Sequence, residues 1–160
     1  MQSRRSRMFV GAPAFALAAR CAALAALSVL LLGACSSADT SDPGAISATA
    51  AAVVTSDQGS LDISVHSAPE AQPTRGVNTL RFVVTRATDG TPVSGLALDI
   101  VPWMPAMGHG ASVKPSVEPG PDPGSYDVHN VNLFMPGLWE IRTTISGTSS
   151  DHVAPKFDIR

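Results

Sequence analysis

The chain has 160 residues and carries 13 acidic against 11 basic side chains, for a formal net charge of −2 at pH 7. All 13 acids and only seven of the basic residues follow residue 35, so this part has a net charge of −6. A net-acidic chain with room for one domain of about 100 residues excludes a basic nucleic-acid-binding protein and a large multidomain enzyme.

The N-terminus has the pattern of a bacterial lipoprotein signal peptide. Arginines near the start are followed by an apolar run over residues 21–32, and Leu32-Gly33-Ala34-Cys35 resembles a lipobox. We therefore expect residues 1–34 to be removed and Cys35 to carry a lipid that anchors the chain outside the cytoplasmic membrane. An uncleaved single-pass anchor is the alternative, although the apolar run is short for a membrane span.

This processing would leave no thiol in the mature chain. Cys21 would be removed and Cys35 acylated, so neither a disulfide nor a thiolate ligand would remain, and any soft ligand would be a methionine. The segment that follows the lipidated cysteine, to residue 59, is rich in Ser, Ala and Thr. Residues 35–59 therefore predict a flexible spacer, in which residues 48–54 could form a short helical turn.

Residues 60–160 predict strands. Apolar and polar residues alternate with a period of two over residues 61–65, 80–84, 96–101, 139–145 and 153–159, and more weakly over the proline-containing run 113–117, which is typical of an edge strand. The parity of the apolar residues changes within residues 126–133, which predicts a bulge. About seven short strands without a helix predict a single immunoglobulin-like antiparallel β-sandwich, with a small barrel as the alternative.

Methionines of the predicted mature chain lie in loops beside proline or glycine. Met104 and Met107 lie close to His109 in one segment, and Met135 precedes Pro136-Gly137. Thioether and imidazole donors suit Cu(I) better than Zn(II) and suit Mg or Ca poorly. We expect Met104, Met107 and His109 to converge on a metal ion, with Met135 as a fourth ligand if the two loops are neighbours.

Two further details belong to this hypothesis. Trp103 could cover a bound cation with its ring face, and the second ring nitrogen of His109 should find a hydrogen-bond acceptor. The alternative is that Met104 and Met107 are buried plugs at the end of the sandwich, beside an exposed His109.

The remaining chemistry-bearing residues point to no catalytic site. His66 and His152 have the outward parity of their strands and are expected at the surface, whereas His129 is ambiguous because its strand is irregular. Asp99 and Glu140 also have outward parity, and no serine lies in a G-x-S-x-G context. We therefore expect a protein that is not an enzyme.

Three motifs, in this order, resemble the YtkA-like domain family. They are Met104-Pro105-Ala106-Met107-Gly108-His109-Gly110, Gly124-Ser125-Tyr126 and Phe134-Met135-Pro136-Gly137-Leu138-Trp139. The resemblance covers about residues 60 to 148 and implies a small extracytoplasmic β-sandwich related to the FixH-like proteins. It also implies an association with copper handling and cytochrome-oxidase assembly. By position it highlights the same four donors and implies structural roles for Tyr126 and Trp139, with Trp139 in the core.

Two functions are consistent with these observations. The first is a lipid-anchored, extracytoplasmic copper-binding protein that holds Cu(I), or exchanges copper with a partner protein, through the Met/His loop. The second is a metal-free interaction module that supports a membrane complex or transporter through an exposed patch of Trp103, Met104 and Met107. Neither function has a nucleic acid as its partner.

Overall fold

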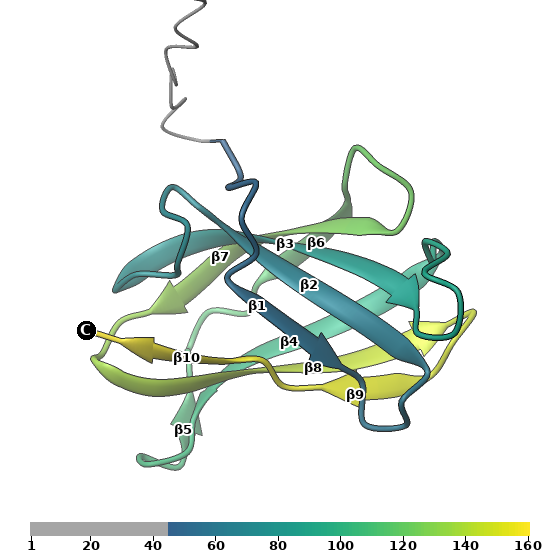
Figure 1. Ribbon diagram of the computed structural model, residues 1–160. Coiled ribbons are helices and arrows are strands. Elements are labelled where there is room, and N and C mark those ends of the chain that lie inside the picture. Colours follow the sequence, from purple (N-terminus) through teal and green to yellow (C-terminus); the bar gives the residue numbers. More distant parts are fainter. Residues whose placement is uncertain (1–44) are drawn as a thin grey trace, which may run out of the picture. The chain divides into compact units, whose positions relative to one another are not determined.

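Alternation of apolar and polar residues gives the strands one common buried side, and they form two antiparallel sheets packed face to face (Figure 1). This is a computed structural model that describes residues 45–160; the predicted signal peptide, Cys35 and the first part of the spacer lie outside the described residues. Within residues 45–160, no helix is long and apolar enough to cross a membrane. The predicted all-β antiparallel sandwich is confirmed.

Each of the two sheets contains five strands. The first sheet has the order β1 (Ala52–Thr55), β2 (Leu61–Ala68), β3 (Gly76–Arg86), β7 (Ser125–Leu133) and β6 (Ser116–Pro119). The second sheet contains β10 (Lys156–Ile159), β8 (Gly137–Gly147), β4 (Leu96–Met104) and β5 (His109–Gly110), with β9 (Asp151–Val153) also paired to β8. The strands outnumber the predicted seven because β1, β5 and β9 are too short for alternation to reveal them.

The core is filled by alternate residues of the long strands, around the fully buried Trp139 and Phe82. Tyr126 is also buried, and its hydroxyl donates to the Val93 carbonyl at 2.9 Å and accepts from the Leu96 amide at 3.1 Å. Tyr126 lies on β7 and Leu96 begins β4, so this side chain links the two sheets. Tyr126 and Trp139 thus have the structural roles that the resemblance implied.

The predicted irregularity of residues 126–133 is a β-bulge in β7. The register changes between the pairs Asn78–Val131 and Leu80–Val128, so two residues of β7 lie opposite one residue of β3. One of the two, Asn130, has a φ of 62°, a left-handed conformation that asparagine tolerates better than most residues. The extra residue reverses the parity, which lets both halves of β7 bury their apolar side chains.

The sandwich begins earlier than residue 60. Strand β1 pairs with β2 along residues 52–55, and the Ser47 amide donates to the Ser67 carbonyl at 3.0 Å. The prediction of a spacer without fixed structure up to residue 59, and of a helical turn over residues 48–54, is therefore wrong in this part. The physical reason is the pair Val53 and Val54, whose branched side chains favour a strand and of which Val54 packs against the core. The weak run 113–117 is shifted as well, since the edge strand β6 covers Ser116–Pro119.

A buried carboxylate connects the turn after β1 to β9. The oxygens of Asp151 accept hydrogen bonds from the Gln58 amide at 3.1 Å, the Ser60 hydroxyl at 2.8 Å and the His152 amide at 2.8 Å. Burial raises the pKa of Asp151, but these bonds and one from Ser56 outweigh burial and lower the pKa to about 2. The two segments are therefore held together by a charged group that stays ionised.

Candidate metal site

The first turn of the candidate site is the hairpin between β4 and β5. Met104 lies directly opposite His109 in this hairpin, and the Met107 and Gly108 amides donate to the Met104 carbonyl at 3.1 and 3.0 Å. Gly108 has a φ of +67°, a conformation that glycine adopts without strain. Because directly opposed residues of a hairpin project to the same side, Met104 and His109 share one face.

The second turn lies between β7 and β8 and is held by two side chains. The Trp139 indole N–H donates to the Met135 carbonyl at 2.9 Å, and Arg75 Nε donates to the Phe134 carbonyl at 3.1 Å. Gly137, where β8 begins, has a φ of +123°. The backbone of this turn is therefore fixed by the buried Trp139 on one side and by the loop before β3 on the other.

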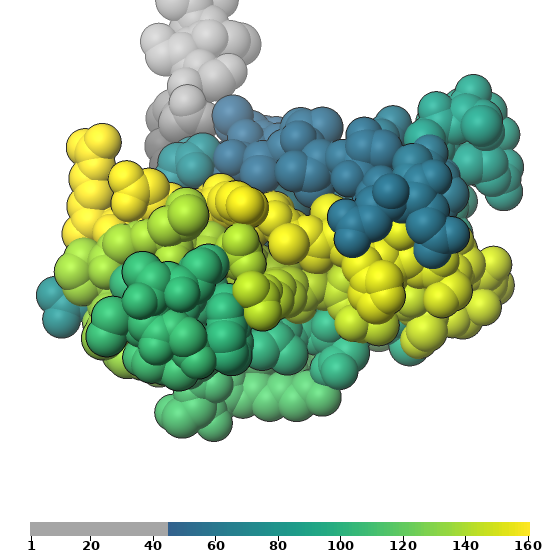
Figure 2. All heavy atoms as spheres, turned by 90° about the horizontal axis from the view of Figure 1, so that it is seen from below, coloured from purple at the N-terminus to yellow at the C-terminus, as the bar shows by residue number. Residues whose placement is uncertain are grey.

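The two turns are neighbours. A Cβ atom placed on Gly137 would lie 2.7 Å from Met104 Cε, so the Met104 methyl group rests against Gly137. The His109 ring stacks on Phe134 with centroids 6.1 Å apart and an interplanar angle of 12°. In Figure 1 both turns lie at the left-hand end of the sandwich, and Figure 2 shows the hairpin as a teal-green projection. We expected Met135 as a fourth ligand only if the two loops are neighbours, and the two loops are neighbours.

The candidate ligands differ in exposure. Met104 is 5% exposed and belongs to the core, whereas Met107 is 57% exposed in the turn. Met135 packs against the core and is partly buried, and His109 is half-buried. The description of a buried plug therefore fits Met104 but not Met107. The prediction of an exposed patch formed by Trp103, Met104 and Met107 is wrong, because the Met104 side chain points into the sandwich.

Trp103 does not face the candidate site. Successive residues of a strand project to opposite sides, so Trp103 lies on the outer side of β4 while Met104 lies on the inner side. There the guanidinium carbon of Arg142 lies 4.7 Å from the centroid of the Trp103 ring. The expectation that Trp103 covers a metal ion is therefore wrong, because the cation over its ring is Arg142.

The His109 ring has one nitrogen available for a ligand. Its Nδ1 lies 3.3 Å from the Gly110 carbonyl oxygen, which can only accept a hydrogen bond, so the tautomer that makes this bond has its proton on Nδ1. The lone pair is then on Nε2. The Gly110 carbonyl is the acceptor that the metal hypothesis requires and that the sequence did not reveal.

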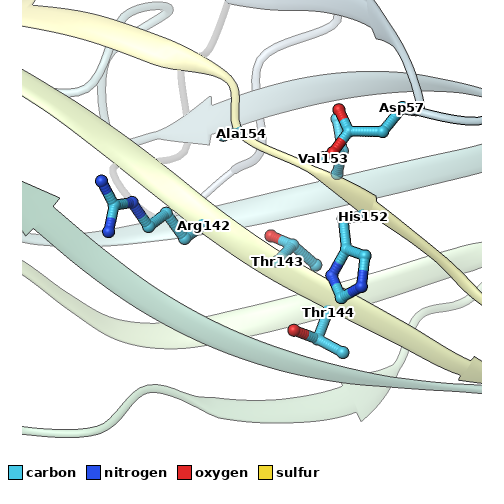
Figure 3. Close-up of a pocket in the computed structure, with 7 residues that line it drawn as sticks. All are labelled: Asp57, Arg142, Thr143, Thr144, His152, Val153 and Ala154. Atoms are coloured by element: carbon cyan, nitrogen blue, oxygen red, sulfur yellow. The ribbon is translucent and has the colours of Figure 1, made fainter.

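The other three histidines lie outside these two turns. His66 was expected at the surface, but it is half-buried, and its Nδ1 lies 2.9 Å from the Ser47 carbonyl oxygen. His129 is half-buried on the β7 bulge. His152 is exposed, as expected, and lines a shallow hollow with Asp57 and Arg142. Figure 3 shows that these three side chains point in different directions.

The donor set at the two turns is mostly thioether. Within residues 45–160, no group of three or more His, Cys, Asp or Glu side chains could hold a metal ion. The two neighbouring turns instead carry one imidazole and three methionine side chains, which are donor types that suit Cu(I). Phe134 and Gly137 also contribute to this site, but the search for metal ligands in the sequence did not identify them because neither side chain is a donor. The sequence Pro136-Gly137, which is typical of a turn, was the signal that could have pointed to Gly137.

Comparison with known proteins gives one finding. A family model described as YtkA-like matches residues 55–144, more than half of the chain. Neither a curated protein nor a solved structure matches the chain. The matched range begins in β1 and ends within β8, so it includes both turns of the candidate site.

Proposed function

The chain belongs to the YtkA-like family, and we propose that it binds copper as Cu(I) through Met104, Met107 and His109, with Met135 as a further donor. One observation carries this proposal. Two turns from distant parts of the sequence meet at one end of the sandwich, where Met104 contacts Gly137 and His109 stacks on Phe134. This contact supports the proposal because each turn carries soft donors and the two turns are neighbours.

The donors have different tasks in this proposal. Met104 is anchored in the core and supplies a sulfur whose position the packing restricts. His109 supplies Nε2, because its Nδ1 faces the Gly110 carbonyl. Met107 is exposed on a turn, so its flexible thioether is the donor that an incoming ion or a partner protein meets first. Exchange of copper with a partner would therefore begin at Met107.

The proposed setting is extracytoplasmic, with the chain anchored by lipid to the bacterial cell membrane or outer membrane and facing the periplasm or the exterior. The lipobox pattern at Cys35 supports a lipid anchor, with residues after Cys35 leading to the sandwich. The partner is then a copper-delivery protein or a membrane complex, and the protein itself performs no catalysis. A Cys35→Ser variant tests the anchor: it should leave the membrane fraction, whereas retention of this variant in the membrane would contradict lipidation at this residue.

Copper binding is tested by competition with the chromogenic Cu(I) chelator bicinchoninic acid under anaerobic conditions. The full-length protein in detergent should withdraw Cu(I) from the chelator and gain thermal stability. The variant Met107→Leu/His109→Asn should bind at least about tenfold more weakly, which corresponds to about 1.4 kcal/mol. The control His152→Asn removes an exposed histidine elsewhere and should bind like the wild type. Equal competition by the wild type and the double variant would refute the copper site.

A metal-free interaction module is the second candidate. Met107 and Phe134 are 57% and 37% exposed on the two neighbouring turns, which favours a small apolar contact surface. The two candidates differ in their response to Cu(I). A docking module should show no change in melting temperature on addition of Cu(I), and should lose a membrane partner in pull-down when Met107 is replaced by a charged residue.

A further inference from the structure

We propose that Phe134 is a positioning residue that fixes the orientation of the His109 imidazole, and so the direction in which Nε2 is presented. The consequence for copper rests on the proposed function, whereas the orientation itself can be measured without metal. The proposal concerns a side chain with no donor atom, on the opposite turn from His109. Three features of this end of the sandwich support it.

The first feature is that the imidazole is stacked on Phe134 while its hydrogen bond is long. His109 lies on the two-residue strand β5, at the edge of its sheet, and the ring is half-buried. The ring Nδ1 makes a long hydrogen bond, 3.3 Å, to the carbonyl oxygen of the adjacent Gly110. Phe134, on the other turn, stacks on the imidazole with ring centroids 6.1 Å apart and an interplanar angle of 12°. This nearly parallel stack is the contact through which Phe134 can set the plane of the imidazole.

The second feature is that Phe134 is itself held in place. Its ring makes an edge-to-face contact with Trp139, with centroids 5.5 Å apart and an interplanar angle of 71°. Trp139 is fully buried and its indole N–H is bonded to the Met135 carbonyl, while Arg75 holds the Phe134 carbonyl. The orientation is thus transmitted from the core, through Trp139 and Phe134, to His109.

The third feature is exposure. Phe134 is 37% exposed, although the core contains several large apolar side chains that are fully buried. A phenylalanine placed only to fill the core would lie inside it, where more of its apolar surface would leave water. Its position at the surface of the turn, in a nearly parallel stack with His109, fits a role at the site better than a role in packing.

The first test uses NMR of the full-length metal-free protein. Nuclear Overhauser signals between the His109 ring protons and protons of Met104 and Gly110 report the orientation of the imidazole without depending on the phenyl ring. Phe134→Leu should weaken or redistribute these signals, because the imidazole then adopts other orientations, whereas Phe134→Tyr should keep them. The control Leu138→Ala shortens another exposed apolar side chain, 44% exposed on β8, and should also keep them. Unchanged His109 signals in Phe134→Leu would overturn the proposal.

The second test measures Cu(I) affinity of the same variants by chelator competition. Phe134→Leu should weaken binding about tenfold, as expected when the residue that orients a metal-bound histidine is lost. Phe134→Tyr should rescue binding to within about twofold, which distinguishes an aromatic positioning role from loss of fold. Wild-type affinity in Phe134→Leu would overturn the positioning role and leave the copper site standing. A wild-type protein that fails to bind Cu(I) would instead refute the proposed function, while the NMR signals would still decide whether Phe134 orients His109.

Discussion

Replacement of Gly137 by alanine is the most direct test of the contact between the two turns. Gly137 begins β8 with a φ of +123°, and a Cβ atom at this position would lie 2.7 Å from Met104 Cε. An alanine therefore causes two separate penalties, one in its own backbone and one in the side chain of Met104. Both penalties follow from the structure of the candidate site rather than from the identity of any bound ion.

The magnitude can be estimated from these two contributions. A non-glycine residue in such a rarely populated backbone conformation costs about 1–3 kcal/mol. The clash is with the far end of a flexible side chain, so Met104 can move, but it is 5% exposed and packed in the core, which adds about 1 kcal/mol. We expect Gly137→Ala to lower the free energy of unfolding by about 2–4 kcal/mol.

The assay is equilibrium unfolding in urea, compared with a matched control. Gly90 also has a positive φ, +70°, but a Cβ atom there would meet nothing within 4 Å. Gly90→Ala should therefore cost only its backbone strain, about 1–2 kcal/mol. In a double-mutant cycle, Met104→Leu should change the cost of Gly137→Ala by at least about 0.5 kcal/mol, because the two positions are in contact.

The reasoning fails on either of two results. If Gly137→Ala destabilises the protein no more than Gly90→Ala, the Met104 side chain does not restrict this turn. If the effects of Met104→Leu and Gly137→Ala are additive, the methyl group of Met104 does not rest against Gly137 in solution.

Three further predictions concern single side chains. Between pH 5 and pH 2 the wild type should lose about 2 kcal/mol of stability that Asp151→Asn lacks. The pKa of Asp151 in the folded protein, about 2, lies below its unfolded value, so the stabilisation is present above the unfolded pKa and is lost on acidification. A free energy of unfolding in urea that falls equally with pH in both proteins would contradict this. Tyr126→Phe should cost about 1–3 kcal/mol in urea unfolding, because the Leu96 amide and the Val93 carbonyl lose their partner; a loss below about 0.5 kcal/mol would show that water replaces the hydroxyl. Met107→Leu should leave the melting temperature of the metal-free protein unchanged but weaken Cu(I) binding in chelator competition; full affinity would remove Met107 from the ligand set.

Much of the fold could be predicted because strand formation here is a local property. Alternation in Leu61–Val65, Leu80–Val84 and Leu96–Ile100 is visible in the sequence and places the same residues in the core. The change of parity after Val128 likewise predicted the bulge in β7. Strand β1 was missed because four residues are too few for alternation to reveal and the pairing with β2 cannot be seen locally; the branched side chains of Val53 and Val54 were the available signal.

The candidate site divides in the same way. The sequence alone shows that methionines lie beside His109 and Pro136, and with them the thioether and imidazole chemistry that they offer. The prediction that these methionines lie in loops holds for Met107 and Met135 but is wrong for Met104, which is the last residue of β4 and faces the core. The sequence could not show that Met104 is buried while Met107, three residues later, is exposed, because this depends on where β4 ends and its hairpin turns.

The sequence by itself therefore determined the strand pattern, the β-class of the fold and the types of donor atoms in each turn. The tertiary structure decided that the hairpin after Met104 lies beside the turn before Gly137, that Phe134 stacks on His109, and that Trp103 faces Arg142 instead of the site. The physical reason is that alternation reports which side of a strand is buried, whereas the neighbours of a turn depend on the order and register of strands distant in sequence.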